Sequence, residues 1–133
     1  MYKHILLPTD GSDLSERAIA AGIDLAKALN ARVSGLFVGE ATYIPGVNET
    51  TNPRTEAALS VITQRAKEAG LISVSAYALG DTPQAAIIQF AKENACDLII
   101  MGTHGRSKVG KLFLGSVAAS VLAESDVPVL LYR

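Results

Sequence analysis

Strand-like and helix-like segments alternate along the whole chain, and this alternation constrains the fold more than any other feature. Five short apolar runs are typical of β-strands, at residues 4–8, 32–38, 71–79, 97–101 and 127–132. Between them lie four longer segments in which apolar residues recur at helical spacing. Strands that alternate with helices form parallel sheets through right-handed crossovers. We therefore predict a three-layer α/β sandwich, Rossmann-like, with a five-stranded parallel sheet in the order 3-2-1-4-5.

Capping signals indicate where the four helices begin and end. Ser12 or Asp13 can cap the first helix, which Asn30 would terminate. Short runs that favour a helix start open the other three helices: Asn52-Pro53, Gly80-Asp81-Thr82-Pro83 with Asp81 as a cap, and Gly115-Ser116. Residues 40–52 are polar and lack periodicity, so we expect an irregular loop there.

Length, composition and charge indicate one globular domain. The chain has 133 residues without a linker or a shift in composition, so we expect a single domain over residues 1–133. A net charge of −1 differs from the strongly basic character of nucleic-acid-binding domains. The apolar runs are far shorter than the ~20 residues of a membrane-spanning helix, and no signal peptide is apparent. We expect a cytoplasmic protein that binds neither nucleic acid nor membrane.

The single cysteine and the first histidine are expected to be structural. Cys96 has no partner for an intramolecular disulfide and no neighbouring residues at metal-ligand spacing. It is interpreted as a small buried residue before a strand. His4 stands at the base of the first strand, far from the residues with functional character.

The stretch from Met101 to Ser116 combines glycines with positive charge. Its glycines are Gly102, Gly105, Gly110 and Gly115, and its basic residues are Arg106, Lys108 and Lys111. No acidic residue occurs between positions 98 and 123. Glycines let backbone amides approach a phosphate, and a helix N-terminus favours negative charge. The sequence therefore predicts an anion-binding loop, in preference to a surface loop whose glycines serve turns and whose lysines serve solubility.

The predicted strand order brings this loop beside a second polar tip. In a parallel sheet the ligand lies beyond the carboxyl ends of the strands, where the strand order reverses. With the order 3-2-1-4-5, the first and fourth strands are neighbours. Their tips, residues 8–10 and 102–105, would converge on one crevice.

The motifs resemble those of the universal stress protein family, in its ATP-binding branch, over essentially the whole chain. They are the opening HILLPTDGS, DLIIMGTHG, the spacing Gly102-x-x-Gly105 with Gly115-Ser116 after nine further residues, and the terminal VPVLLYR. The resemblance implies a Rossmann-like fold similar to the adenine-nucleotide α-hydrolases and a site for ATP or AMP. It also implies a cytoplasmic, regulatory stress-response role, a homodimer, and an unidentified protein partner.

The resemblance also implies roles for individual residues. Pro8, Thr9 and Asp10 would border the adenine and ribose, Val38 would offer backbone contacts to the base, Met101 and Gly102 would line the ribose, and Gly105, Gly115, Ser116 and Val117 would hold the phosphates.

Three side chains at the expected site have more than one interpretation. The Asp10 carboxylate could accept hydrogen bonds from base or ribose or reach a phosphate-bound metal such as Mg²⁺, and an Asx-turn is its structural alternative. His104 could reach a phosphate or lie near the ribose, or be a solvated loop histidine. Arg106 is the first candidate for gripping the outer phosphates.

Other interpretations of the nucleotide site and of the function agree less well with the sequence. Residues 105–111 match G-x-x-x-x-G-K, but Leu112 replaces the hydroxyl residue that would hold magnesium, so the match is treated as coincidence. No glutamate or glutamine lies in either site loop, which argues against an enzyme and allows at most slow ATP hydrolysis. The alternatives are an enzyme of the adenine-nucleotide α-hydrolase type or a slow ATPase, and a nucleotide-free protein-interaction module.

The last strand provides its own reason to expect a homodimer. The segment that begins at Val127 and ends at Tyr132 is almost wholly apolar and is predicted at the sheet edge. An uncovered apolar edge strand favours pairing with another chain, and a two-fold partner would cover it.

Overall fold

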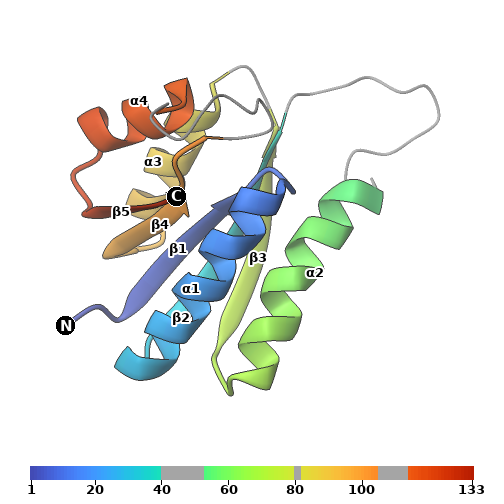
Figure 1. The fold of residues 1–133 in the computed structure, drawn as a ribbon. Coiled ribbons are helices and arrows are strands. Elements are labelled where there is room, and N and C mark those ends of the chain that lie inside the picture. The colour runs from blue at the N-terminus through green and yellow to red at the C-terminus, as the bar shows by residue number, and fades with distance from the viewer. Residues whose placement is uncertain (40–52, 80–81, 105–113) are drawn as a thin grey trace.

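The computed structural model describes residues 1–39, 53–79, 82–104 and 114–133, and its strands form one sheet with helices on both faces (Figure 1). The five parallel strands lie in the order β3-β2-β1-β4-β5, which confirms the predicted fold class. In chain order the elements are β1 (His4–Thr9), α1 (Asp13–Leu29), β2 (Arg32–Gly39), α2 (Pro53–Glu68), β3 (Ser73–Leu79), α3 (Pro83–Glu93), β4 (Leu98–Gly102), α4 (Ser116–Glu124) and β5 (Val129–Tyr132).

The core consists of two clusters, one on each face of the sheet. Helices α1 and α2 cover one face, and α3 and α4 cover the other (Figure 1). Ile5 and Leu7 of β1 belong to the cluster under α1 and α2, whereas Leu6 between them belongs to the cluster under α3 and α4. All three side chains are fully buried. A central parallel strand covered on both faces therefore has an unbroken apolar sequence.

Several helix signals in the sequence correspond to helix ends in the structure, whereas Asn52, Asp81 and the loop expected over residues 40–52 lie outside the described residues. Ser12 is the N-cap of α1, and its hydroxyl accepts the Ser15 amide at 3.3 Å. Asn30 ends α1 in the left-handed conformation, with φ of 53°. Pro83 stands at the start of α3 and Gly115 caps α4, as predicted. In the described parts of the chain, no helix has the length and apolar character that crossing a membrane requires.

Two strands are shorter than predicted, because neighbouring turns use the first residues of each apolar run. β3 begins at Ser73, since the Leu71 amide donates to a carbonyl in the last turn of α2 at 2.8 Å. β5 begins at Val129, since the Ser125 hydroxyl donates to the Val127 carbonyl at 2.9 Å and accepts the Val127 amide at 3.0 Å.

The central strand β1 pairs unequally with its two neighbours. Its register with β2 continues up to Thr9 opposite Phe37, almost to the end of both strands. Its register with β4 stops at Leu6 opposite Ile99. Beyond that pair the two strands no longer share a ladder, although both continue toward the carboxyl edge of the sheet. This is the point where the strand order reverses, which is where α/β sheets bind ligands.

At the opposite, amino edge of the sheet, His4 and Cys96 are buried structural residues, as expected. His4 Nδ1 lies 3.0 Å from the carbonyl oxygen of Asn94, which can only accept, so Nδ1 carries the hydrogen. Nε2 then accepts the hydroxyl of Ser34 at 2.7 Å. Burial, followed by the positive charge of Arg32, lowers the pKa of His4. Burial also raises the pKa of the Cys96 thiol to about 11, which makes the thiol unreactive near neutral pH.

Candidate functional site

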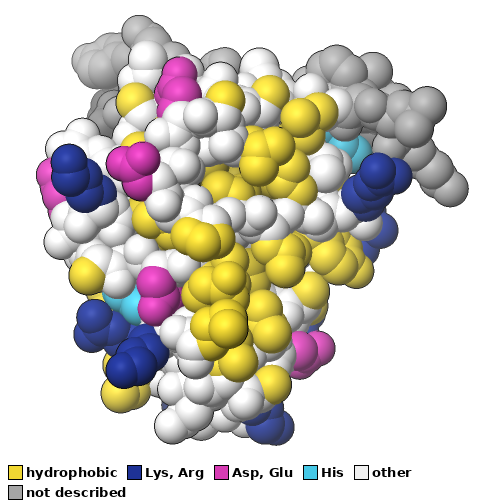
Figure 2. Space-filling view, turned by 90° about the vertical axis from the view of Figure 1, so that its left-hand side faces the viewer, with side chains coloured by type: hydrophobic (Ala, Val, Ile, Leu, Met, Phe, Trp, Pro, Cys, Tyr) yellow, Lys and Arg dark blue, Asp and Glu magenta, His cyan; other side chains and the backbone are white. Residues whose placement is uncertain are grey.

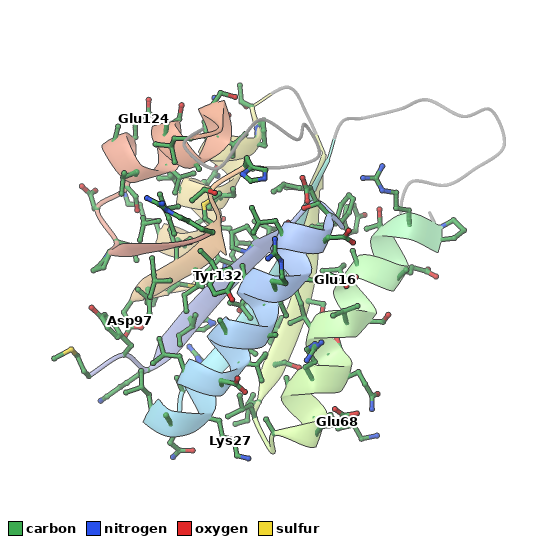
Figure 3. The ribbon with its side chains drawn as sticks, in the orientation of Figure 1. Glu16, Lys27, Glu68, Asp97, Glu124 and Tyr132 are labelled. Carbon is green, nitrogen blue, oxygen red and sulfur yellow. The ribbon has the colours of Figure 1, made fainter. Side chains whose placement is uncertain are left out.

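A tight turn shapes the tip of β1, the first of the two expected halves of the site. Thr9 is almost completely buried, and its hydroxyl oxygen accepts the Gly11 amide at 3.1 Å. Gly11 has φ of +81°, a left-handed conformation that glycine adopts without a steric penalty. The turn leads into α1 through Ser12. Glu16 in the first turn of α1 thus lies at the carboxyl edge of the sheet, whereas Lys27 and Asp97 lie at the other end (Figure 3).

Asp10 follows the strand and makes the Asx-turn that the sequence allowed. Its Oδ1 accepts the Ser12 amide at 2.9 Å and the Ser15 hydroxyl at 2.7 Å. Among the described residues, none donates a hydrogen bond to the other oxygen, Oδ2. The structural role of Asp10 therefore uses one carboxylate oxygen and leaves the second as an acceptor.

A cation from α2 reaches this tip, and sequence reasoning missed it. The Arg54 guanidinium donates from Nη2 to the Asp10 carbonyl at 2.9 Å. Arg54 is the second residue of α2, and every helix that follows a strand in such a sheet begins at the carboxyl edge. The position of Arg54 in the first turn of a predicted helix is the signal that could have identified it.

Two other predicted residues lie on the strands next to β1, at different depths. Val38 of β2 comes one position after Phe37, the register partner of Thr9, so its backbone lies close to the end of β1. Met101 of β4 is buried in the cluster under α3 and α4, so its side chain packs in the core.

Gly102, at the end of β4, is packed closely against α1. A Cβ at this position would lie 3.0 Å from Leu14 Cγ, in the first turn of α1. After Gly102 the Thr103 amide donates to the Tyr132 carbonyl at 2.9 Å, which ties the tip to the end of β5. The Thr103 hydroxyl lies 3.2 Å from His104 Nδ1. The predicted residues Gly102 and His104 are therefore ordered parts of this tip.

Gly115 joins the start of α4 to the same tip. Its amide donates to the Thr103 carbonyl at 2.7 Å, so this amide is used within the protein. Any contact between a phosphate and Gly115 would therefore have to be made without a hydrogen bond from the Gly115 amide. The predicted residues Gly105 and Arg106 lie outside the described residues.

The first turn of α4 presents backbone donors beside the tip of β4. The first hydrogen bond of the helix runs from the Ala119 amide to the Gly115 carbonyl at 2.9 Å. The amides of Ser116, Val117 and Ala118 make no hydrogen bond to the described residues, as expected of the first turn of a helix. The turn carries no acidic residue, so the dipole of the helix favours an anion here.

The edge thus combines an acceptor at the tip of β1 with donors at the start of α4. The described residues contain no group of three or more His, Cys, Asp or Glu side chains that could hold a metal ion. The arrangement suits a ligand that carries an anion at one end and hydrogen-bond donors at the other.

The chain is similar to known proteins in both sequence and structure. A family model described as the universal stress protein family matches residues 1–133. The chain is similar to the "universal stress protein in QAH/OAS sulfhydrylase 3′region" of Thermus aquaticus, with 39% identity over 137 residues and complete coverage of both chains. A solved universal stress protein in complex with cAMP superposes with a TM-score of 0.78 at 27% identity, covering 99% of this chain and 97% of the other.

A further structure, of protein MJ0577, superposes with a TM-score of 0.76 at 33% identity and covers 99% of this chain and 96% of that one. MJ0577 is a universal stress protein of Methanocaldococcus jannaschii. These similarities extend over both halves of the candidate site. Because the family model spans residues 1–133, the chain belongs to the universal stress protein family.

Proposed function

We propose that this protein binds an adenine nucleotide, ATP or AMP, at the carboxyl edge where β1 and β4 separate, and that the bound nucleotide regulates a stress response. The observation that carries the proposal is the first turn of α4. Its amides at Ser116 and Val117 have no partner among the described residues and start directly beside the tip of β4. Such a helix start is a phosphate site in many nucleotide-binding folds.

The remaining groups at the edge match the other end of a nucleotide. Oδ2 of Asp10 would accept hydrogen bonds from the sugar hydroxyls, with Pro8 and Thr9 of the same tip beside the base and sugar. The backbone of Val38, at the end of the neighbouring strand, would contact the base. The backbone of Gly102, at the end of β4, would line the ribose. The solved relative in complex with cAMP supports an adenine nucleotide as the ligand class.

A metal ion would enter with the phosphates. The described residues offer no three-residue cluster of metal-binding side chains, so Mg²⁺ would depend on phosphate oxygens together with the Asp10 carboxylate. Nucleotide affinity should then fall when EDTA replaces Mg²⁺ if ATP is bound as its magnesium complex. AMP binding should depend on Mg²⁺ less, because AMP carries a single phosphate.

The proposal includes a homodimer through β5 in the cytoplasm. β5 is the last strand in the sheet order, so one of its edges pairs with no other described strand. Leu130 of β5 and Leu122 of α4 are both large, exposed hydrophobic residues. Figure 2 shows hydrophobic side chains gathered in a strip on the side of the molecule where β5 and α4 lie in Figure 1. Pairing β5 with its copy would cover this strip, and nucleotide occupancy would alter the surface that the dimer presents to a protein partner.

Removing one backbone donor from α4 tests the phosphate site. Ser116 is the first residue of α4, and proline at this position of a helix is well tolerated. The preceding Gly115 has φ of −62° and ψ of 155°, an extended conformation that suits a residue before proline. Ser116→Pro should therefore keep the helix while deleting one amide hydrogen. We expect isothermal titration calorimetry with ATP and AMP to give about tenfold weaker binding.

Ser116→Ala is the matched control. It removes the hydroxyl but keeps the amide, so its affinity for ATP should stay close to that of the unmodified protein. Equal affinities of the proline variant and the unmodified protein for ATP and AMP would show that α4 is not part of the site. Absence of binding heat for both ATP and AMP in the unmodified protein would contradict the proposal that the protein binds an adenine nucleotide.

A further inference from the structure

Ser12 and Ser15 are connected to Asp10 by hydrogen bonds whose direction can be derived. The Ser15 hydroxyl lies 2.7 Å from Oδ1 of Asp10, and a carboxylate oxygen only accepts, so Ser15 donates its hydrogen. The Ser12 hydroxyl lies 2.9 Å from the Ser15 oxygen. Since the only hydroxyl hydrogen of Ser15 is directed to Asp10, Ser12 must be the donor in this second bond. The order is therefore Ser12 to Ser15 to Asp10.

These bonds fix one side of the carboxylate to a rigid element. Oδ1 of Asp10 also accepts the Ser12 amide at 2.9 Å, so two donors hold the same oxygen. Ser15 is 7% exposed and lies in the first turn of α1, which makes its hydroxyl an anchor fixed by packing. A carboxylate held by the Ser12 amide alone could still rotate about its side-chain torsions.

We propose that Ser15 is a positioning residue, which directs Oδ1 of Asp10 to the protein and so reserves Oδ2 for the sugar hydroxyls of the nucleotide. The inference rests on the proposed function. It adds which group of the nucleotide Asp10 recognises, namely the sugar hydroxyls. Both hydroxyl hydrogens of the serine pair are donated within the protein, so the pair offers the ligand no hydroxyl donor. This part of the edge therefore selects groups that donate, and a ribose with its hydroxyls is preferred to a sugar without them.

The test compares ATP with 2′,3′-dideoxy-ATP by calorimetry. The unmodified protein should bind ATP about tenfold more tightly than the dideoxy nucleotide. Ser15→Ala should lose most of this preference, because its affinity for ATP should fall while its affinity for the dideoxy nucleotide stays unchanged. When Asp10→Ala is already present, Ser15→Ala should have no further effect, because Ser15 acts through Asp10.

Ser34→Ala is the matched control for loss of a buried hydroxyl. Ser34 lies at the amino edge of the sheet, where its hydroxyl bonds to His4. This variant should be less stable than the unmodified protein and should keep the full preference for ATP. A Ser15→Ala protein with the unmodified preference, or an unmodified protein with no preference, would overturn the inference while nucleotide binding itself persists.

Crystal structures of the nucleotide-free protein and of Ser15→Ala provide a test that is independent of binding. We expect the Asp10 carboxylate of the variant to leave its 2.9 Å contact with the Ser12 amide or to change its rotamer. An unchanged carboxylate would overturn the positioning role. If the unmodified protein bound neither nucleotide, the proposed function would fail, and this comparison would still decide whether Ser15 positions Asp10.

Discussion

The amide of Gly115 donates to the carbonyl of Thr103 at 2.7 Å, which attaches the N-terminus of α4 to the tip of β4. The approach leaves little room for a side chain at position 115. A Cβ there would lie 3.1 Å from His104 Cα and 3.2 Å from the Thr103 carbonyl oxygen. Both neighbouring atoms belong to the backbone and cannot yield by a change of rotamer. Gly115 therefore sets where the first-turn amides of α4 stand relative to β4.

Gly115→Ala should loosen this attachment. The added methyl group must displace backbone, so we expect the free energy of unfolding to fall by about 1–3 kcal/mol. ATP should bind more weakly, since the first turn of α4 moves away from the tip of β4. Urea unfolding followed by circular dichroism measures the stability, and calorimetry measures the affinity. Ser116→Ala, at the neighbouring exposed position, should change neither, and equal stability of Gly115→Ala and the unmodified protein would contradict this account.

The same contact illustrates what the sequence could and could not predict about the site. Glycine spacing and alternation of strands correctly placed α4 after β4, because both depend on local pattern and on general rules of chain topology. The hydrogen bond from Gly115 to Thr103 spans a loop, and no local pattern indicates that the amide is used within the protein.

Arg54 and Ser15 were missed for a related reason. Their contacts with Asp10 depend on how α1 and α2 approach the tip of β1, and this is decided by packing between elements far apart in the sequence. Periodicity identified the faces of these helices that are buried. It did not identify which polar residue in the first turn of each helix would reach the strand tip.

A second close approach, between α2 and β2, predicts a larger loss of stability. A Cβ at Gly35 would lie 2.8 Å from Ile62 Cδ1, 3.2 Å from Cγ2 and 3.4 Å from Cβ. Ile62 is fully buried, so it has no space into which to move. Gly35→Ala should push α2 off the sheet and lower the free energy of unfolding by about 2–3 kcal/mol, measured by urea unfolding.

The double variant Gly35→Ala with Ile62→Val provides the check on this explanation. Removing a methyl group from Ile62 makes room for the new Cβ, so the pair should be less destabilised than the sum of the single variants. Strict additivity would show that the strain does not arise between these two residues.

The buried histidine predicts how stability depends on pH. Burial and the charge of Arg32 lower the pKa of His4 from the usual 6.5, against the carbonyl of Asn94 and the charge of Asp97, which raise it. Between the two pKa values the unfolded chain binds more protons than the folded protein, so stability rises with pH. The contribution of His4 is fully present above pH 6.5 and is lost as the pH falls below that value toward the lowered pKa. Urea unfolding at a series of pH values should show this decrease.

The variant His4→Gln separates the titration of His4 from that of the neighbouring carboxylate, Asp97. Burial of Asp97 opposes its ionisation, but amides of His4 and Lys3 donate to it and outweigh burial, so its pKa is lowered below 3.8. Its contribution is present above pH 3.8 and is lost only as the pH falls through the lowered pKa. The glutamine variant should thus flatten the pH dependence just below pH 6.5 and retain the decrease in strong acid. An unchanged slope below pH 6.5 would show that another group titrates there.

The exposed apolar edge predicts the effect of a charge on assembly. Leu130 of β5 is 41% exposed, and a lysine in its place would put a positive charge beside its own copy across a two-fold axis. We expect light scattering at low micromolar concentration to give twice the chain mass for the unmodified protein and to shift toward the mass of one chain for Leu130→Lys. Ile72→Lys is the matched control, because Ile72 is 74% exposed but precedes β3 at the opposite edge of the sheet. The control should stay a dimer. A single-chain mass for the unmodified protein would exclude the dimer, and loss of the dimer in Ile72→Lys alone would place the interface at β3 instead of β5.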